Sequence, residues 1–203
     1  WDFADPGLEG DVFEVVVDAD LSGGPLIPQL REDFDKTYNW EEYMLHGVHA
    51  QNYHIYTPAE EKKWAMVWGC QPWAADLPWA NAAYSYDFRH GESGKLILEF
   101  WITPFDYAPA EGPEKAIVSP LNEDTIIGLS WTILERDEFK NTPTGFAFRS
   151  LSHKTTMYGN ASDLVKFRLM PLEPKFRRSI EAAWDFRIVD LDNLHNLDIV
   201  GFG

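Results

Sequence analysis

The sequence predicts an all-β fold, a jelly-roll-like sandwich of two antiparallel sheets joined by long loops. Short segments alternate apolar and polar side chains, and this is the period of a strand with one buried face. Clusters of Gly, Pro, Asn and Asp separate these segments, and signals for helix are weak along the chain. Several such strands with few helices favour two sheets packed face to face.

The first predicted strand is 12–17, and a turn over residues 18–24 ends it. Segments 51–57 and 63–68 form a predicted hairpin with Trp64, Met66 and Trp68 on one face. The remaining predicted strands are bounded by turn residues and cover residues 83–88, 95–103, 125–134, 164–172 and 181–189.

The strand 95–103 carries the clearest alternation. Its buried face holds Leu96, Leu98, Phe100 and Ile102, and Pro104 ends the strand. The opposite face carries Glu99 and Trp101. We therefore expect this large indole to lie on the outer surface beside a carboxylate.

The 203 residues carry a formal charge of −16, a field that repels phosphate backbones and anionic headgroups. We therefore expect no nucleic-acid partner, and no apolar run is long enough to predict membrane insertion. A single Cys excludes a disulfide within the chain. We predict one domain over residues 1–190, followed at 191–203 by a polar tail or linker toward a further domain.

Three stretches carry a family resemblance: residues 11–18 (DVFEVVVD), 94–105 (GKLILEFWITPF) and 127–131 (IGLSW). In order and spacing they resemble family 9 carbohydrate-binding modules and related DOMON-like β-sandwich domains, over about residues 11–172. The resemblance implies extracellular, non-catalytic glycan recognition. The usual family opening, Ile-Asp-Gly with a following Asp-Trp pair, is missing here, so no binding residue is carried over from the family.

Exposed indoles are the first candidates for binding, because sugar rings present C–H faces that stack on aromatic rings while their hydroxyls seek polar side chains. Trp73 and Trp79 lie in a loop rich in Gly and Pro, with Gln71, Asp76 and Asn81 nearby. These loop indoles are equally well explained as plugs at the open end of the sandwich. The predicted ligand-binding residues from this region and the neighbouring strand are Trp73, Trp79, Trp101, Gln71, Asn81 and Glu99.

A row of polar residues follows the strand 51–57, where Asn52, His54 and Tyr56 share one face. We expect Asn52 and His54 to read sugar hydroxyls. The same residue types serve polysaccharide lyases of sandwich fold, and a glycoside hydrolase of sandwich fold stays a further alternative. A structural polar face under a loop is the plain reading.

The turn Asp18-Ala-Asp20-Leu-Ser22-Gly23 presents oxygen ligands at alternate positions, the spacing that wraps Ca²⁺. Asp18, Asp20 and Ser22 are therefore the candidate ligands of a structural calcium ion. A solvated turn capped by Asp and Ser explains the same residues.

The expected function is thus a non-catalytic, extracellular or cell-surface domain that binds a polysaccharide or oligosaccharide, more consistent with a binding module than with an enzyme. Further domains of a longer chain, or copies of this chain, are the other expected partners. The competing structural hypothesis is a building block of an extracellular fibre or surface layer, in which the aromatic patches serve protein contacts.

Overall fold

The computed structural model describes residues 11–24, 47–58, 64–89, 92–135, 147–171, 185–189 and 198–202. Within these residues the regular structure consists of antiparallel strands and short 3-10 helices, so the predicted all-β class is confirmed. None of the described helices has the length and apolar character needed to cross a membrane.

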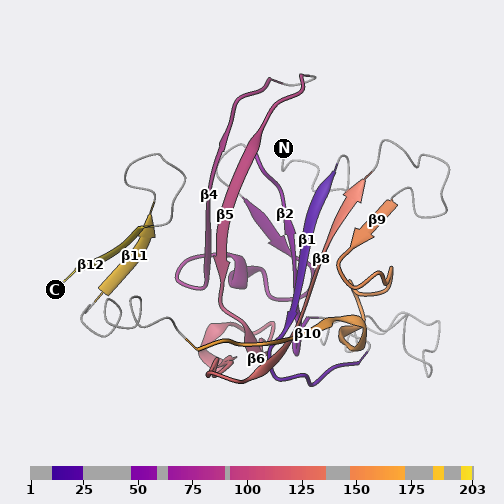
Figure 1. Cartoon of the computed structure of the whole chain (residues 1–203). Helices are drawn as coiled ribbons and strands as arrows, with labels where there is room; N and C mark the ends of the chain where they lie inside the picture. Colours follow the sequence, from indigo (N-terminus) through magenta and orange to yellow (C-terminus); the bar gives the residue numbers. More distant parts are fainter. Residues whose placement is uncertain are drawn as a thin grey trace. The chain divides into compact units, whose positions relative to one another are not determined.

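The chain forms two compact units, residues 1–121 with 126–167, and residues 122–125 with 168–203. The second unit contains an antiparallel pair, β11 (Asp185–Val189) and β12 (Asp198–Phe202), drawn in yellow in Figure 1. Residues 198–202 were expected in a polar tail, but Ile199 and Val200 give this stretch the β-branched character that favours a strand.

The main sheet of the first unit has six strands, with β1 paired to β2 on one side and to β8 on the other. The strand order is β10-β8-β1-β2-β3, and β9 also pairs with β8. The bounds are β1 (Val12–Asp18), β2 (Gln51–Ile55), β3 (Ala65–Val67), β8 (Ile126–Glu135), β9 (Ala147–Ser150) and β10 (Val165–Arg168).

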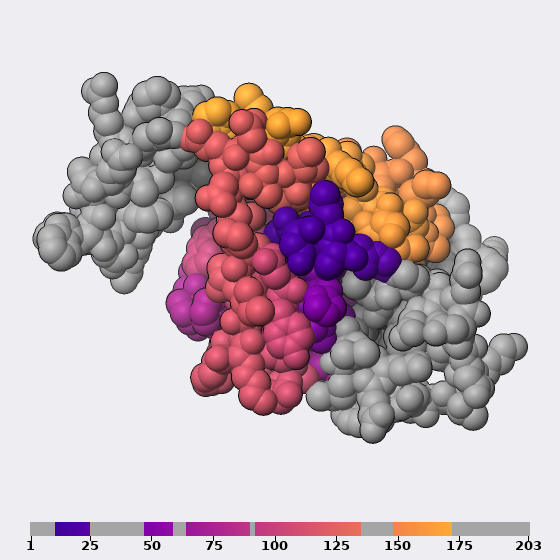
Figure 2. Space-filling view, turned by 90° about the horizontal axis from the view of Figure 1, so that it is seen from below, coloured from indigo at the N-terminus to yellow at the C-terminus, as the bar shows by residue number. Residues whose placement is uncertain are grey.

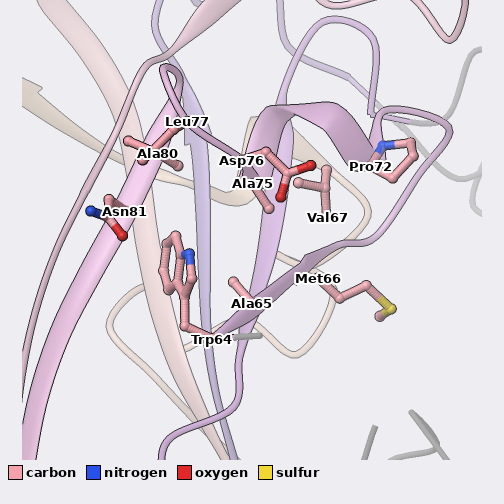
Figure 3. Close-up of a pocket in the computed structure, with 10 residues that line it drawn as sticks. All are labelled: Trp64, Ala65, Met66, Val67, Pro72, Ala75, Asp76, Leu77, Ala80 and Asn81. Atoms are coloured by element: carbon pink, nitrogen blue, oxygen red, sulfur yellow. The ribbon is translucent and has the colours of Figure 1, made fainter. Parts of the chain in front are cut away.

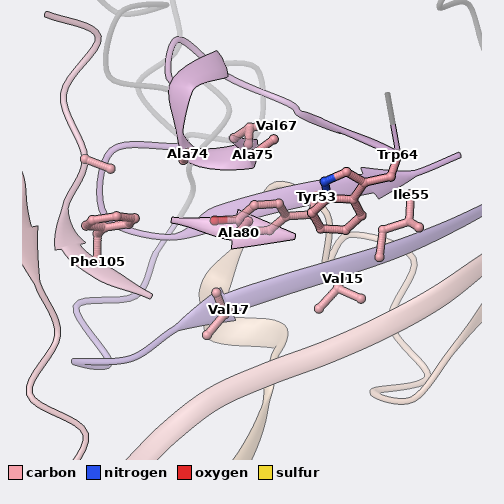
Figure 4. Close-up of a cluster of buried hydrophobic side chains, with 11 residues drawn as sticks. Val15, Val17, Tyr53, Ile55, Trp64, Val67, Ala74, Ala75, Ala80 and Phe105 are labelled. Carbon is pink, nitrogen blue, oxygen red and sulfur yellow. The ribbon is translucent and has the colours of Figure 1, made fainter. Parts of the chain in front are cut away.

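The two faces of β1 bury different clusters because alternate side chains point to opposite sides of a sheet. Val15 and Val17 belong to the larger core, where Figure 4 shows Tyr53 among side chains that arrive from several elements. On the other face Val16 packs against Met157 and Leu164. A segment near residue 160 therefore covers this second face.

An extended ribbon of β4 (Ala80–Tyr86) and β5 (Leu96–Ile102) packs against the larger core. Figure 1 shows the far end of this ribbon reaching past β1 and β2. Leu98, Phe100 and Ile102 pack on the core, so the face predicted for these three residues is confirmed. Leu96 is exposed instead, because it lies toward the end of the ribbon that leaves the core.

A small sheet of β6 (Phe105–Tyr107) and β7 (Ile117–Val118) follows the ribbon and sends Phe105 into the same core.

The predicted strand 63–68 is shorter than expected. It is confined to β3, so Trp64 precedes the alternation and joins the larger core, while Met66 pairs with His54 in the register of β2. The prediction that Trp64 and Met66 share one face was therefore wrong.

Candidate functional site

A pocket of about 480 Å³ opens beside β3, the 3-10 helix η3 (Pro72–Ala75) and the start of β4. Most of its wall is apolar, and Asp76 and Asn81 are its two polar lining residues. Figure 3 shows the Trp64 indole at one side of the space, with Asp76 across from it and Asn81 beside Ala80. A largely apolar wall with a few polar groups is the usual make-up of a site for a small polar ligand.

The backbone around Asp76 turns the chain from η3 into β4. The Asp76 amide donates to the Trp73 carbonyl at 3.1 Å and closes the 3-10 helix. Its carbonyl accepts from the amides of Trp79 at 2.8 Å and Ala80 at 3.1 Å. These bonds fix the backbone from which the Asp76 carboxylate and, one residue after Ala80, the Asn81 amide project into the pocket.

The two polar side chains of the pocket offer complementary hydrogen-bonding atoms. Within the described part of the chain the Asp76 carboxylate has no hydrogen-bond or ion-pair partner, so both oxygens are available as acceptors. Asn81 Oδ1 accepts from the Ala82 amide at 2.9 Å. Because that carbonyl is engaged, the Asn81 amide nitrogen is the atom left to donate to a ligand.

Asn81 also belongs to the outer face of the ribbon, where two further predicted binding residues lie. Asn81 lies directly opposite Trp101 in the β4–β5 register, and the next pair on that face is Ala83 with Glu99. Trp101 is 42% exposed. The structure therefore brings together three of the predicted binding residues, Asn81, Trp101 and Glu99.

Trp73 and Trp79 are used differently from Trp101. Their rings meet Phe105 edge-on, with ring centroids 5.2 Å and 5.4 Å away, and both pack against the larger core. Trp73 Nε1 also donates to the Pro109 carbonyl at 3.1 Å. The structure thus places these two predicted platforms, half-buried, at the edge of the larger core.

Gln71, Asn52 and His54 are buried, although we expected all three at the binding surface. Asn52 and His54 do share one face, but residues near 160 cover that face: the Asn52 amide donates to the Tyr158 carbonyl at 2.9 Å. The expectation failed because the sequence of a strand does not reveal that a distant segment covers its polar face.

The partner of this polar row is Glu14, which is 1% exposed and which the sequence interpretation left unassigned. Asn52 Nδ2 donates to Glu14 Oε1 at 2.6 Å, and His54 Nε2 lies 3.1 Å from the same oxygen. Burial and the Glu14 charge raise the pKa of the neighbouring Tyr56 to about 12. The sequence signal for this buried carboxylate was a single Glu within the otherwise apolar segment 12–17.

Several polar atoms of this cluster keep unmet hydrogen-bonding capacity. Glu14 Oε2, Asn52 Oδ1 and His54 Nδ1 are buried and have no hydrogen-bond partner in the part of the protein that the structure describes. Since the residues that resembled a lyase surface lie inside, they are not presented to a polymer. The cluster is therefore a buried polar network, in line with the alternative that this row is a structural polar face under a loop.

The turn after β1 was expected to hold calcium. Asp18 Oδ2 accepts from the Gly23 amide and Asp20 Oδ1 from the Ser22 amide, both at 2.9 Å. Figure 2 shows the indigo residues of 11–24 at the surface beside orange residues near 160, and the Gly24 amide donates to Ser162 Oγ at 3.1 Å.

Asp18 is the unusual member of this turn. Burial, with Asp20 beside it, raises the pKa of Asp18 to about 6. Its Oδ1 is buried without a hydrogen-bond partner among the described residues. An orphaned carboxylate oxygen next to a second carboxylate fits a hard cation, although no group of three or more His, Cys, Asp or Glu gathers anywhere in the described chain.

Comparison of the chain with known protein families, with curated proteins and with solved structures finds no match. The described residues and their chemistry therefore carry the functional argument.

Proposed function

We propose that this chain is a non-catalytic carbohydrate-binding domain whose site is the pocket at Trp64, Asp76 and Asn81, extended by Trp101 and Glu99 on the ribbon. One observation carries the proposal: an exposed indole, Trp101, lies opposite Asn81, whose side-chain amide also lines a largely apolar pocket. The short stretches that resemble family 9 carbohydrate-binding modules support the same class.

The chemistry of the site suits a sugar ring. An apolar wall can receive the C–H face of a pyranose, and the exposed Trp101 indole offers a flat π surface on which such a face stacks. Asp76 accepts hydroxyl hydrogens, whereas the Asn81 amide donates to hydroxyl or ring oxygens. The volume of about 480 Å³ lies in the range of small-ligand sites, so the pocket holds one or two sugar units while Trp101 contacts the next.

The test compares two exposed tryptophans of the same chain. Trp101→Ala should weaken binding of a glycan identified on an array by about tenfold or more, as the loss of a central aromatic contact does. Trp131→Ala is the matched control, because Trp131 is similarly exposed at 37% but lies on β8 outside the pocket. Calorimetry in which both variants bind like the unaltered protein would remove Trp101 from the site, and an array without any signal would remove the function.

A second candidate function, a building block that assembles with its own copies, is favoured by a different surface. Trp131 and Ile133 project from β8 on the same side as the half-buried Phe13, and both are exposed. Light scattering separates the two hypotheses, since a binding domain stays discrete and a building block forms larger particles with concentration.

Two further features belong to the proposal. Calcium is proposed as a structural ion that Asp18 and Asp20 would hold with Ser22, supported by the orphaned Asp18 Oδ1. An extracellular or cell-surface location is proposed because polysaccharides are met there, and localisation of a tagged full-length protein by fractionation tests it.

A further inference from the structure

We infer that the pocket selects uncharged glycans and rejects uronates, and that Asp76 is the residue that sets this selectivity. This inference rests on the proposed function and names the substrate class of the same site. It follows from the charges that a ligand meets at each step into the pocket.

The hydrogen-bonding atoms of the pocket carry the first part of the argument. Asp76 contributes acceptor oxygens, and Asn81 contributes an amide donor because its carbonyl oxygen is bound to the Ala82 amide. A hydroxyl group can donate to the first and accept from the second. A carboxylate can only accept, so at Asp76 it finds a like charge in place of a donor.

The absence of compensating charge carries the second part. No Lys, Arg or His lines the described pocket. Glu99 adds a carboxylate on the ribbon face next to Asn81 and Trp101. A uronate that followed this path would pass two fixed negative charges with no cation among the described lining residues to offset them, in a protein whose formal charge is −16.

Solvent access decides how strong the rejection is. Asp76 is exposed, so its charge acts through water and salt screens it. At a separation of about 4 Å the repulsion of two unit charges then lowers affinity by roughly tenfold, and 1 M salt removes most of this difference. Rejection of the acid therefore depends on ionic strength, while binding of a neutral sugar does not.

The experiment measures Kd for a neutral oligosaccharide that binds and for the same backbone oxidised to the uronic acid at C6. The unaltered protein should bind the acid roughly tenfold more weakly at low salt. Asp76→Asn keeps the size of the side chain and should reduce this ratio to below about threefold, because the acid no longer meets a like charge there. Because the Asp76 carboxylate has no bond within the described residues, the thermal midpoint of the variant should stay unchanged.

Glu114→Gln is the matched control, since it also removes one exposed negative charge but lies outside the pocket. It should leave the ratio near tenfold, which separates the local carboxylate from the net charge of the chain. Equal affinity of the unaltered protein for acid and neutral forms, or an Asp76→Asn ratio that matches Glu114→Gln, would overturn the inference while leaving glycan binding intact. Absence of binding to either form would instead overturn the proposed function.

Discussion

The Gln51 side chain forms two hydrogen bonds with the backbone of Phe105. Its Oε1 accepts from the Phe105 amide at 3.0 Å, and its Nε2 donates to the Phe105 carbonyl at 3.1 Å, although the two residues are far apart in sequence. The buried Gln51 amide group thus bonds to both backbone groups of Phe105, as a neighbouring strand would. This clamp holds Phe105, whose ring contacts Trp73 and Trp79, and Trp73 belongs to η3, which lines the candidate pocket through Pro72 and Ala75.

Replacing Gln51 should destabilise the protein more than its size suggests. Gln51→Leu keeps most of the volume but removes the side-chain hydrogen bonds to the buried Phe105 amide and carbonyl, at about 2–4 kcal/mol in the free energy of unfolding. Urea denaturation measures the loss. Ser85→Ala on the exposed ribbon is the control and should change stability by less than about 0.5 kcal/mol. A Gln51→Leu protein as stable as this control would show that the clamp contributes nothing.

A second buried carboxylate beside Glu14 should not be tolerated at neutral pH. Asn52→Asp replaces the donor that lies 2.6 Å from Glu14 Oε1 with a like charge. We expect a loss of roughly 3–5 kcal/mol at pH 7. Stability relative to the unaltered protein should partly return near pH 4–5, because two close carboxylates can share one proton. Thermal melts across this pH range, with Asn81→Asp on the surface as control, would reject the network if both variants responded alike.

The pH dependence of stability should carry the signature of Asp18. Its pKa is about 6 in the folded protein against 3.8 as the ordinary value, so between these values the folded state binds the proton and the unfolded state does not. The contribution of Asp18 to stability is therefore fully present below about pH 4 and is lost as the pH rises through 6. Asp20 acts in the opposite sense below pH 4. Partial burial acts to raise its pKa, but hydrogen bonds from Ser22, a side-chain hydrogen bond with Asp18 and the charge of His49 together lower it.

Asp18→Asn removes the contribution of Asp18 to the pH dependence of stability. Relative to the variant, the unaltered protein should gain about 1 kcal/mol of stability between pH 7 and pH 5, as one group with this pKa shift provides. Urea denaturation at several pH values checks the difference. A difference between the two proteins that stays constant over this range would contradict a raised pKa at Asp18.

Calcium should compete with that proton if the turn holds the ion. Adding millimolar Ca²⁺ at pH 7 should raise the thermal midpoint of the unaltered protein, and EDTA should reverse the effect. Asp18→Asn should abolish the response, because Asp18 supplies the orphaned oxygen. Equal melting curves with Ca²⁺, Mg²⁺ and EDTA would leave the turn as a hydrogen-bonded feature only.

The strand pattern was readable from sequence wherever one face is buried and the strand is long. Residues 95–103 show this, since Leu98, Phe100 and Ile102 pack inward while Trp101 faces outward. The short pair β6–β7 was not predicted, because two or three residues are too few to show a period.

The candidate site was only partly readable. The outward position of Trp101 and Glu99 follows directly from alternation along 95–103, whereas Asn81 was expected beside a loop and lies on β4, which begins earlier than the predicted strand 83–88. For Trp73 and Trp79 the sequence left a binding platform and a plug of the sandwich as equal alternatives. The structure packs both rings against Phe105, which lies well beyond them in the sequence. Trp64 was missed as a pocket residue, since only the short extent of β3 sets its position.

The most direct measurement is a titration of the ¹⁵N-labelled protein with a neutral oligosaccharide, followed through the indole N–H signals of its nine tryptophans. The signals are assigned by single Trp→Phe changes. If the sugar binds at the pocket and ribbon, the indole signals of Trp64 and Trp101 shift together along one saturable curve while the Trp131 signal stays in place. Shifts confined to Trp131, or no shift at saturating sugar, would contradict it.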